Sequence, residues 1–322
     1  MNGMSDDALS DILRLVRLKG CVYFQSDFSP PWGMHMEKGA FAQFHLVVRG
    51  QCWLRHDNDD HQLSQGDIAV LPHGDGHALS DTPASPTRPG PEVLAAIRSG
   101  RPTFGDGLPG ARLLCGHFEF ERELNHPLIR DLSPLILVKG IGHRQPGWLE
   151  TIIPMLIGEA GAGQPGADTV VERLAEVLLI QVLRTHMMAQ TEDIGFLAAI
   201  GDRRINGALK YIHLSTENDI TLADIARTVG MSRSSLAVRF KELVGDTPMN
   251  YLTNWRLLRA KDMIMTGNIP LAEVAEQVGY TSEAAFSRAF KREYDQSPSA
   301  FRRTQYRGSE AKTVSGSSGL PG

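Results

Sequence analysis

The chain has 322 residues, enough for about two domains. Apolar residues make up 42% of it and charged residues 22%, a composition that supports folded cores and excludes an intrinsically disordered chain. The net charge of −4 is unevenly distributed: residues 201–307 carry 16 Lys and Arg against 12 Asp and Glu, whereas residues 1–200 carry 16 against 24. The basic C-terminal third therefore favours a nucleic-acid-binding module at that end.

The sequence also predicts the compartment. The N-terminal segment is acidic and lacks the apolar core of a secretory signal. No apolar run reaches the roughly 18 residues that a membrane span needs. Cys21, Cys52 and Cys115 are too few and too scattered for a disulfide scaffold. We therefore expect a cytoplasmic protein with no membrane partner.

Residues 9–140 alternate short apolar runs with Gly, Pro, Asn and Asp, which is typical of the short strands of a small barrel or sandwich. A polar turn at 56–61 separates two of these runs. The Pro- and Gly-rich segment 83–110 predicts a long surface loop with a helical turn at 92–98. The predicted strands are 44–50, 51–57, 66–72, 112–120 and 135–140.

After Gly147 the apolar spacing becomes that of a helix, which predicts a helical linker over 147–200. Within it, residues 169–188 carry a wide apolar face that includes Leu178 and Leu183. A face of this width is expected to pack on the first domain, on a second subunit, or on both. We predict a homodimer formed chiefly through this helix.

Residues 201–307 read as short helices and contain an internal repeat. The segment 222–232 aligns with 271–281, and the segment 239–248 aligns with 289–298. Each copy predicts a short helix, a tight turn and a second helix, which is the helix–turn–helix arrangement of many DNA-binding domains. An ordinary α-hairpin used twice for packing is the alternative, and the duplication and positive charge favour DNA binding.

Local signals support the same arrangement. Gly230 and Gly279 end the first helices, where a tight turn needs a positive φ. Ser232 is a natural N-cap for the second helix of the first copy, as Thr281 or Ser282 is in the second copy. The apolar residues that anchor the second helices are Leu236, Phe240, Phe286 and Phe290.

Residues 205–306 resemble the DNA-binding domain of the AraC/XylS transcription regulators, which joins two such motifs by a long helix. Residues 250–264 are similar to that connecting helix, and residues 278–303 are similar to the closing signature of the family. The resemblance implies sequence-specific binding to double-stranded promoter DNA, with the exposed face of each second helix in a major groove. It also implies RNA polymerase as a partner if the protein is an activator.

The resemblance further implies which side chains meet DNA. Glu283 could accept a hydrogen bond from cytosine, and Arg288 could donate to guanine or hold a phosphate. In the first copy Ala237 and Val238 depart from the polar or aromatic residues often found there, which leaves them van der Waals contact. The implied base-reading residues are Ser234, Ala237, Val238, Glu283, Ala284, Ser287 and Arg288, with Ser282 at the start of the helix. The implied phosphate contacts are Arg233, Arg239, Lys241 and Lys291.

The N-terminal region resembles the cupin-type sensor domain that precedes AraC-type DNA-binding domains. GDIAVLPHGDGH (66–77) is similar to the second cupin motif, with Asp81 where Asn is common. The first motif is retained at His45, but Val47 replaces its second His and its Glu is missing. Because a metal-dependent cupin enzyme needs those ligands together, this departure argues against an oxygenase or isomerase, while a bound metal or a small-molecule effector in this domain stays open.

Cys21, His45, His77 and Cys115 are the candidate signal-responsive residues. Buried cysteines are commonly inert apolar residues, and a single His is more commonly structural than a ligand. The alternative is that these side chains meet inside the barrel as an oxidant-responsive thiol pair or a soft-metal site. His117, on the same strand face as Cys115, would lower the pKa of that thiol if it were protonated.

The predicted fold class is α+β: a cupin-like β-barrel at 9–140, a helical linker at 147–200, an all-α domain with two helix–turn–helix motifs at 201–307, and a disordered tail at 308–322. The predicted function is a transcription regulator whose promoter binding responds to a small molecule, thiol oxidation or a metal. The alternatives are a cupin-type metal-dependent enzyme fused to a DNA-binding domain, and a purely structural DNA-bending protein.

Overall fold

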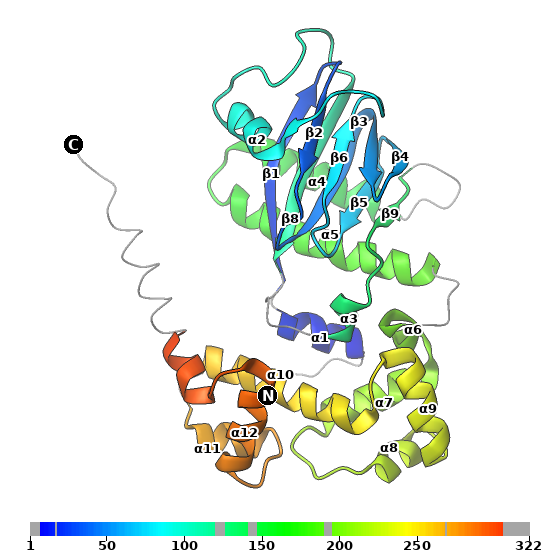
Figure 1. The fold of residues 1–322 in the computed structure, drawn as a ribbon, viewed down its shortest axis with the longest axis vertical. Coiled ribbons are helices and arrows are strands. Elements are labelled where there is room, and N and C mark those ends of the chain that lie inside the picture. Colours follow the sequence, from blue (N-terminus) through cyan, green and yellow to red (C-terminus); the bar gives the residue numbers. More distant parts are fainter. Residues whose placement is uncertain are drawn as a thin grey trace, which may run out of the picture. The chain divides into compact units, whose positions relative to one another are not determined.

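The computed structural model describes residues 7–16, 18–119, 126–140, 147–189, 195–267 and 269–304. The chain divides into two compact units (Figure 1). Residues 17–191 form the N-terminal unit, and residues 1–16 join residues 192–322 in the DNA-binding unit. No helix among the described residues is long and apolar enough to cross a membrane. The tail predicted at 308–322 lies outside the described residues.

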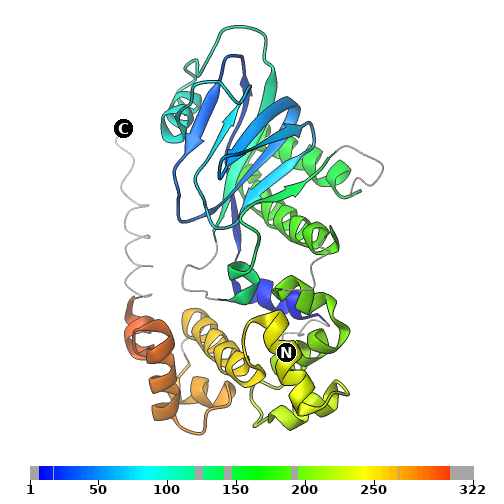
Figure 2. The ribbon, with the colours of Figure 1, turned by 45° about the vertical axis from the view of Figure 1, so that its right-hand side comes forward.

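The N-terminal unit is built on a nine-stranded sheet that curls into a half-barrel, as Figure 2 shows. The main path runs β1-β8-β3-β6-β2-β7, with β4 and β5 paired to β3 and β9 paired to β5. This curled sheet confirms the cupin-like fold class. The strands are β1 (Lys19–Phe28), β2 (Gly33–Met36), β3 (Ala42–His56), β4 (Asp59–Ser64), β5 (Ile68–Leu71), β6 (His77–Ser80), β7 (Arg88–Pro89), β8 (Ala111–Glu119) and β9 (Ile136–Val138).

The long strand β3 joins the two halves of the sheet. Its first part pairs with β5 and β8, and its second part pairs with β4 and β6. Gly50 lies between them with φ +78°, and a Cβ there would fall 2.0 Å from the carbonyl oxygen of Gly110. Only glycine allows this bend and close approach. The two strands predicted at 44–50 and 51–57 are therefore one bent strand.

Helices cover the sheet on both sides. α4 (Leu149–Ala162) and α5 (Ala167–Ala189) pack on each other, and both contact β1 (Figure 1). α2 (Gly90–Arg98) packs on β1, β2 and β7, so the predicted loop at 83–110 contains a helix longer than one turn. α3 (Pro127–Arg130) is a single turn.

The region predicted as a linker belongs to the fold of the N-terminal unit through α4 and α5. α5 packs on β1, β9 and α4 of its own unit, and Leu178 and Leu183 are both 0% exposed. These two leucines are therefore core residues, and they cannot form a surface for a second subunit.

The DNA-binding unit is all-helical and contains both predicted helix–turn–helix motifs. The first is α8 followed by α9, the second is α11 followed by α12, and α10 joins them (Figure 1). Of its other helices, α6 packs on α7 and α9, and α7 packs on α8 and α9. The helices of this unit are α1 (Ala8–Val16), α6 (Phe196–Gly201), α7 (Arg203–Leu214), α8 (Leu222–Thr228), α9 (Arg233–Val244), α10 (Pro248–Thr266), α11 (Leu271–Gln277) and α12 (Glu283–Tyr294).

The predicted turns and caps are confirmed. Gly230 and Gly279 have φ values of +65° and +79° after the first helix of each motif. Ser232 Oγ accepts a hydrogen bond from the Ser235 amide at 3.1 Å, which caps α9. Ser282 Oγ accepts from the Ala285 amide at 3.2 Å, which caps α12. These bonds satisfy amides that no helical carbonyl can reach.

The N-terminal helix α1 packs on α7 and α10, so residues 9–16 lie in the DNA-binding unit although a start of the sensor at residue 9 was predicted. A buried polar pair lies in this contact: Asp11 Oδ2 is 3.4 Å from Nδ1 of His213, which is 0% exposed. The other ring nitrogen of His213 is 2.9 Å from the Tyr251 hydroxyl, and its ring stacks on Trp255. Burial lowers the pKa of His213.

We expect Ile12→Ala to loosen the DNA-binding unit, although Ile12 lies far in sequence from the other helices of that unit. Ile12 is 0% exposed, and truncating such a side chain costs about 2–5 kcal/mol of local stability. Hydrogen exchange of peptides from α7 and α10 in the full-length chain should accelerate. Arg14→Ala is the matched control because that side chain is 60% exposed. Unchanged exchange in the Ile12 variant would show that α1 does not stay docked in solution.

Candidate signal site and DNA-contacting helices

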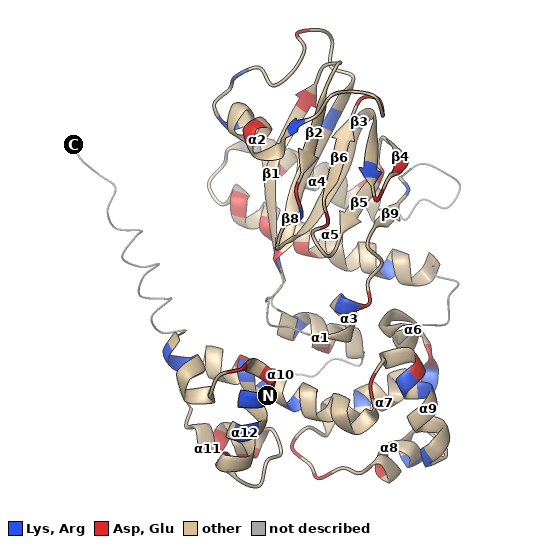
Figure 3. Cartoon of the chain, in the orientation of Figure 1, with Lys and Arg blue, Asp and Glu red and all other residues tan. Residues whose placement is uncertain are grey.

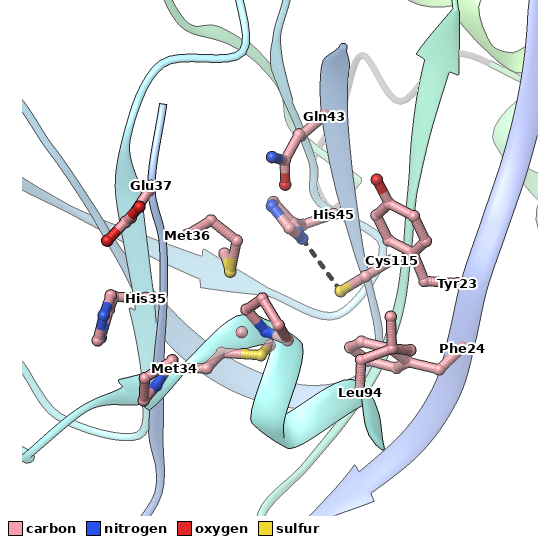
Figure 4. Close-up of a pocket in the computed structure, with 13 residues that line it drawn as sticks. Tyr23, Phe24, Met34, His35, Met36, Glu37, Gln43, His45, Leu94 and Cys115 are labelled. Atoms are coloured by element: carbon pink, nitrogen blue, oxygen red, sulfur yellow. Dashed lines mark hydrogen bonds between the residues drawn. The ribbon is translucent and has the colours of Figure 1, made fainter. Parts of the chain in front are cut away.

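A cavity of about 460 Å³ opens between the sheet and α2 in the N-terminal unit (Figure 4). This volume lies in the range of small-molecule sites. β1, β2, β3 and β8 supply most of its lining, and α2 closes one side. Its apolar lining residues are Phe24, Met34, Met36, Pro89, Pro91 and Leu94. Its polar lining residues are Tyr23, His35, Glu37, Gln43, His45 and Cys115.

Three predicted residues meet here: His45 and Cys115 line the cavity, and His77 lies behind His45. His45 Nδ1 lies 3.0 Å from Cys115 Sγ, and His45 Nε2 lies 2.7 Å from His77 Nε2. Cys115 is 2% exposed, and the two histidines are also buried. Figure 4 shows the thiol beside the His45 ring, facing the cavity. β3 and β8 are paired with His45 opposite Cys115, and that register brings the two side chains together.

The protons on His45 and His77 can be assigned by starting from His77. His77 Nδ1 is 2.8 Å from the carbonyl oxygen of Asp75, which can only accept, so Nδ1 carries a proton. Burial lowers the pKa of His77 to about 4, so the ring is neutral near pH 7 and its Nε2 accepts. His45 Nε2 must then be the donor to His77.

The same reasoning reaches the thiol. Burial, together with the neighbouring His77, lowers the pKa of His45 well below its ordinary value. His45 is therefore neutral, and with its proton on Nε2 its Nδ1 accepts from the S–H of Cys115. Burial raises the pKa of Cys115 well above its ordinary value, so the resting group is a thiol. The result is a directed chain from Cys115 through His45 and His77 to the Asp75 carbonyl.

Cys21 is not part of this chain. It lies on β1 opposite His117, whereas Cys115 lies opposite Phe24, and both cysteines are free thiols. The Cys21 sulfur is 3.9 Å from the carbonyl oxygen of Val22, and burial raises the pKa of this thiol. The structure thus brings Cys115, His45 and His77 together and places Cys21 apart from them in the hydrogen-bonding pattern.

His117 does not activate Cys115 in the way the sequence suggested. Its ring stacks on Tyr23 at 4.8 Å and contacts Phe41, while its Nε2 lies 3.2 Å from a Glu119 oxygen. The histidine that contacts the thiol comes from the neighbouring strand instead. Spacing along one strand revealed the shared face of Cys115 and His117 but not the closer partner across the sheet.

Cys115, His45 and His77 are poorly arranged to coordinate a metal ion. His45 lies between Cys115 and His77 and uses both ring nitrogens in contacts with them, so the three donors do not converge on one point. Among the described residues, no group of three or more His, Cys, Asp or Glu side chains could hold a metal ion. The arrangement suits proton transfer and hydrogen bonding to a molecule in the cavity.

The second helices of the two motifs, α9 and α12, expose most of the predicted DNA contacts. Figure 3 shows Lys and Arg on both helices. Ala237, Ser287 and Arg239 are half-buried, and the Arg239 guanidinium already lies 3.3 Å from Asp202, an ion pair with which a phosphate would compete. The exposed predicted contacts are Arg233, Ser234, Val238, Lys241, Ser282, Glu283, Ala284, Arg288 and Lys291. Which of them touch DNA stays a prediction.

Comparison with known proteins agrees with this architecture. A family model described as Cupin matches residues 7–188, and one described as Helix-turn-helix domain matches residues 225–304. An AraC-like transcription regulator of Streptomyces antibioticus is 34% identical over 304 residues, which cover 92% of this chain and 98% of the relative. The chain belongs to the AraC-like transcription regulators.

Other members and structures are similar over different lengths. The transcriptional regulator AlkR of Acinetobacter baylyi is 28% identical over 306 residues, covering 92% of this chain and 99% of the relative. A solved DNA-binding domain of AdpA, in complex with a target DNA, is 28% identical and covers 31% of this chain and 90% of that chain, with a TM-score of 0.30. AraC-like relatives are named transcription regulators, so the protein is a DNA-binding regulator and the enzyme alternative finds no support.

Proposed function

We propose that this AraC-like regulator changes its promoter binding when a small molecule occupies the cavity of its N-terminal unit. One observation carries the proposal: the protein contains both a duplicated DNA-binding motif and a cavity of about 460 Å³. Hydrogen bonds connect Cys115 and His45, which line this cavity, to His77. A regulator without an effector has no need of such a cavity. A purely structural DNA-bending protein would lack this coupling.

Of the three signals predicted from the sequence, a small molecule agrees better with this geometry than a metal ion or thiol oxidation does. Metal binding by His45 would break its hydrogen bond with Cys115 or with His77, because each of its two ring nitrogens is already used in one of them. Disulfide formation would require Cys21 and Cys115 to approach within bonding distance, and each now has its own separate surroundings. We therefore place the effector in the cavity and assign no cofactor.

Two further partners belong to the proposal. Promoter recognition by repeated half-sites calls for two copies of the chain, and the exposed apolar residues Val170 and Val177 on α5, with Met155 on α4, are the surface we assign to the second copy. If the protein is an activator, RNA polymerase is the other partner. The cytoplasm, where promoter DNA lies, is the proposed location.

The experiment that tests this function measures binding of the full-length chain to its promoter DNA and to random DNA over a salt series. We expect a preference for the promoter, and an affinity that falls steeply with salt because phosphate contacts release counterions. Compounds that bind the cavity should shift the promoter affinity and leave the random-DNA affinity nearly unchanged. Equal affinity for both DNAs at every salt concentration would refute sequence-specific regulation.

A further inference from the structure

The cavity presents one thiol among its described lining residues, that of Cys115, to a space with largely apolar walls (Figure 4). We propose that Cys115 captures apolar α,β-unsaturated carbonyl compounds by covalent addition, with His45 as the base that accepts the thiol proton. The inference rests on the proposed sensor function of the cavity, and it names the chemical class of effector.

The base is already in place. Nδ1 of His45 accepts the S–H of Cys115 at 3.0 Å, so proton transfer requires no rearrangement of either side chain. Nε2 of His45 donates to His77 at 2.7 Å, and the Asp75 carbonyl orients His77 in turn. His77 is a positioning residue, and it can share the positive charge that develops on His45 when the thiol loses its proton.

The surroundings select for an apolar electrophile. Cys115 is 2% exposed and protonated at rest, so it reacts slowly with dissolved oxidants, because the thiolate is the form that attacks them. A reagent must first occupy the cavity. No Lys or Arg is found among the described residues that line it, and Glu37 is the carboxylate at its exposed side, so anionic compounds are disfavoured. Neutral carbonyl compounds with an apolar chain match Phe24, Met34 and Leu94.

The addition balances without a second reagent. A sulfur lone pair forms the bond to the β-carbon while the π electrons of the C=C bond shift to the carbonyl oxygen as an enolate. The proton moves from Cys115 Sγ to His45 Nδ1 and then to the α-carbon, so no group leaves and nothing is oxidised or reduced. The enolate oxygen needs donors, and the Tyr23 hydroxyl and Gln43 amide line the same cavity. Burial raises the pKa of Tyr23 to about 12, so its hydroxyl keeps the proton it donates.

The test exposes the full-length protein to trans-2-nonenal, followed by intact-mass measurement and peptide mapping after borohydride reduction. We expect one adduct on Cys115, with a gain equal to the whole mass of the reagent before reduction. Nonanal, which lacks the C=C bond, should give no thioether. Acrylamide, which adds to thiols but is polar, should modify Cys115 at least about tenfold more slowly than nonenal, measured against free cysteine.

Variants separate the base from the pocket. Cys115→Ser should abolish the adduct, whereas Cys52→Ser should retain it, because Cys52 is equally buried but does not line the cavity. His45→Gln keeps an amide for hydrogen bonding but removes the base, and should slow the addition by about 100-fold. A competition needs no variant: 1-nonanol, which cannot react, should protect Cys115 from nonenal and leave the reactivity of Cys21 unchanged.

The outcomes are distinct. Modification of Cys21 with Cys115 left free, an unchanged rate in a folded His45→Gln protein, or no protection by 1-nonanol would overturn the inference. The proposed function would survive any of these if the protein still prefers its promoter DNA. Conversely, an adduct on Cys115 that leaves promoter affinity unchanged would support the capture chemistry and refute its role as the signal.

Discussion

Replacing both Leu178 and Leu183 with glutamate is expected to unfold the N-terminal unit. Both side chains are 0% exposed on α5, which packs on β1, β9 and α4. Losing a buried leucine costs about 2–5 kcal/mol, and a buried unpaired carboxylate adds to that cost. The sum approaches or exceeds the roughly 5–15 kcal/mol that stabilises an ordinary domain. Thermal unfolding followed by circular dichroism, together with limited proteolysis, measures the loss.

The matched control lies on the other face of the same helix. Val170 and Val177 are 39% and 41% exposed, so replacing both with glutamate should leave the N-terminal unit folded, with the circular dichroism spectrum and protease resistance of a native domain, because surface substitutions change the stability of a fold by about 0.5 kcal/mol or less. If this face joins two copies, light scattering will show a dimer for the parent and a monomer for the Val170→Glu, Val177→Glu protein. A folded Leu178→Glu, Leu183→Glu protein would contradict the core position of these leucines.

Substitutions on α9 and α12 should distinguish residues that set overall DNA affinity from residues that set sequence preference. Arg288 is exposed on α12, and if it donates to guanine, Arg288→Ala should cost about 1–3 kcal/mol on the promoter site and relax preference at one base pair. That cost corresponds to an increase in Kd of about 5- to 150-fold. Lys241→Ala on α9 should weaken promoter and random DNA about equally, since a phosphate contact carries no base information. Fluorescence anisotropy on both DNAs gives the four affinities.

The control for loss of positive charge is Arg173→Ala. This side chain is 69% exposed on α5 of the N-terminal unit, beside Glu176, and should leave both affinities unchanged. Equal losses on promoter and random DNA for Arg288→Ala would place this arginine on a phosphate. The polar side chains of α12 and its N-cap that stay predicted to contact bases would then be Ser282, Glu283 and Ser287.

The helix–turn–helix motifs could be predicted because their signals are local. Gly230 and Gly279 were recognised as turn residues since few other residues adopt a positive φ, and both do adopt it. Ser232 and Ser282 were recognised as caps because the amides they satisfy lie three residues away. Such signals need no knowledge of distant contacts. Strands β1, β2, β4, β6 and β7 were not predicted, although β1 has ten residues and lines the cavity.

By itself, the sequence determined the family, the two helix–turn–helix motifs and the identity of the histidines and cysteines worth examining. Only the tertiary structure decided that His45 meets Cys115, 70 residues away, and His77, 32 residues away. It likewise decided that α1 packs on α7 and α10, and that Leu178 is a core residue of its own chain. The physical reason is that an apolar helix face buries against whatever surface the fold brings to it, and a strand pairs in a register set by distant residues. The spacing of neighbouring side chains predicts neither the packing partner of a helix nor the register of a strand.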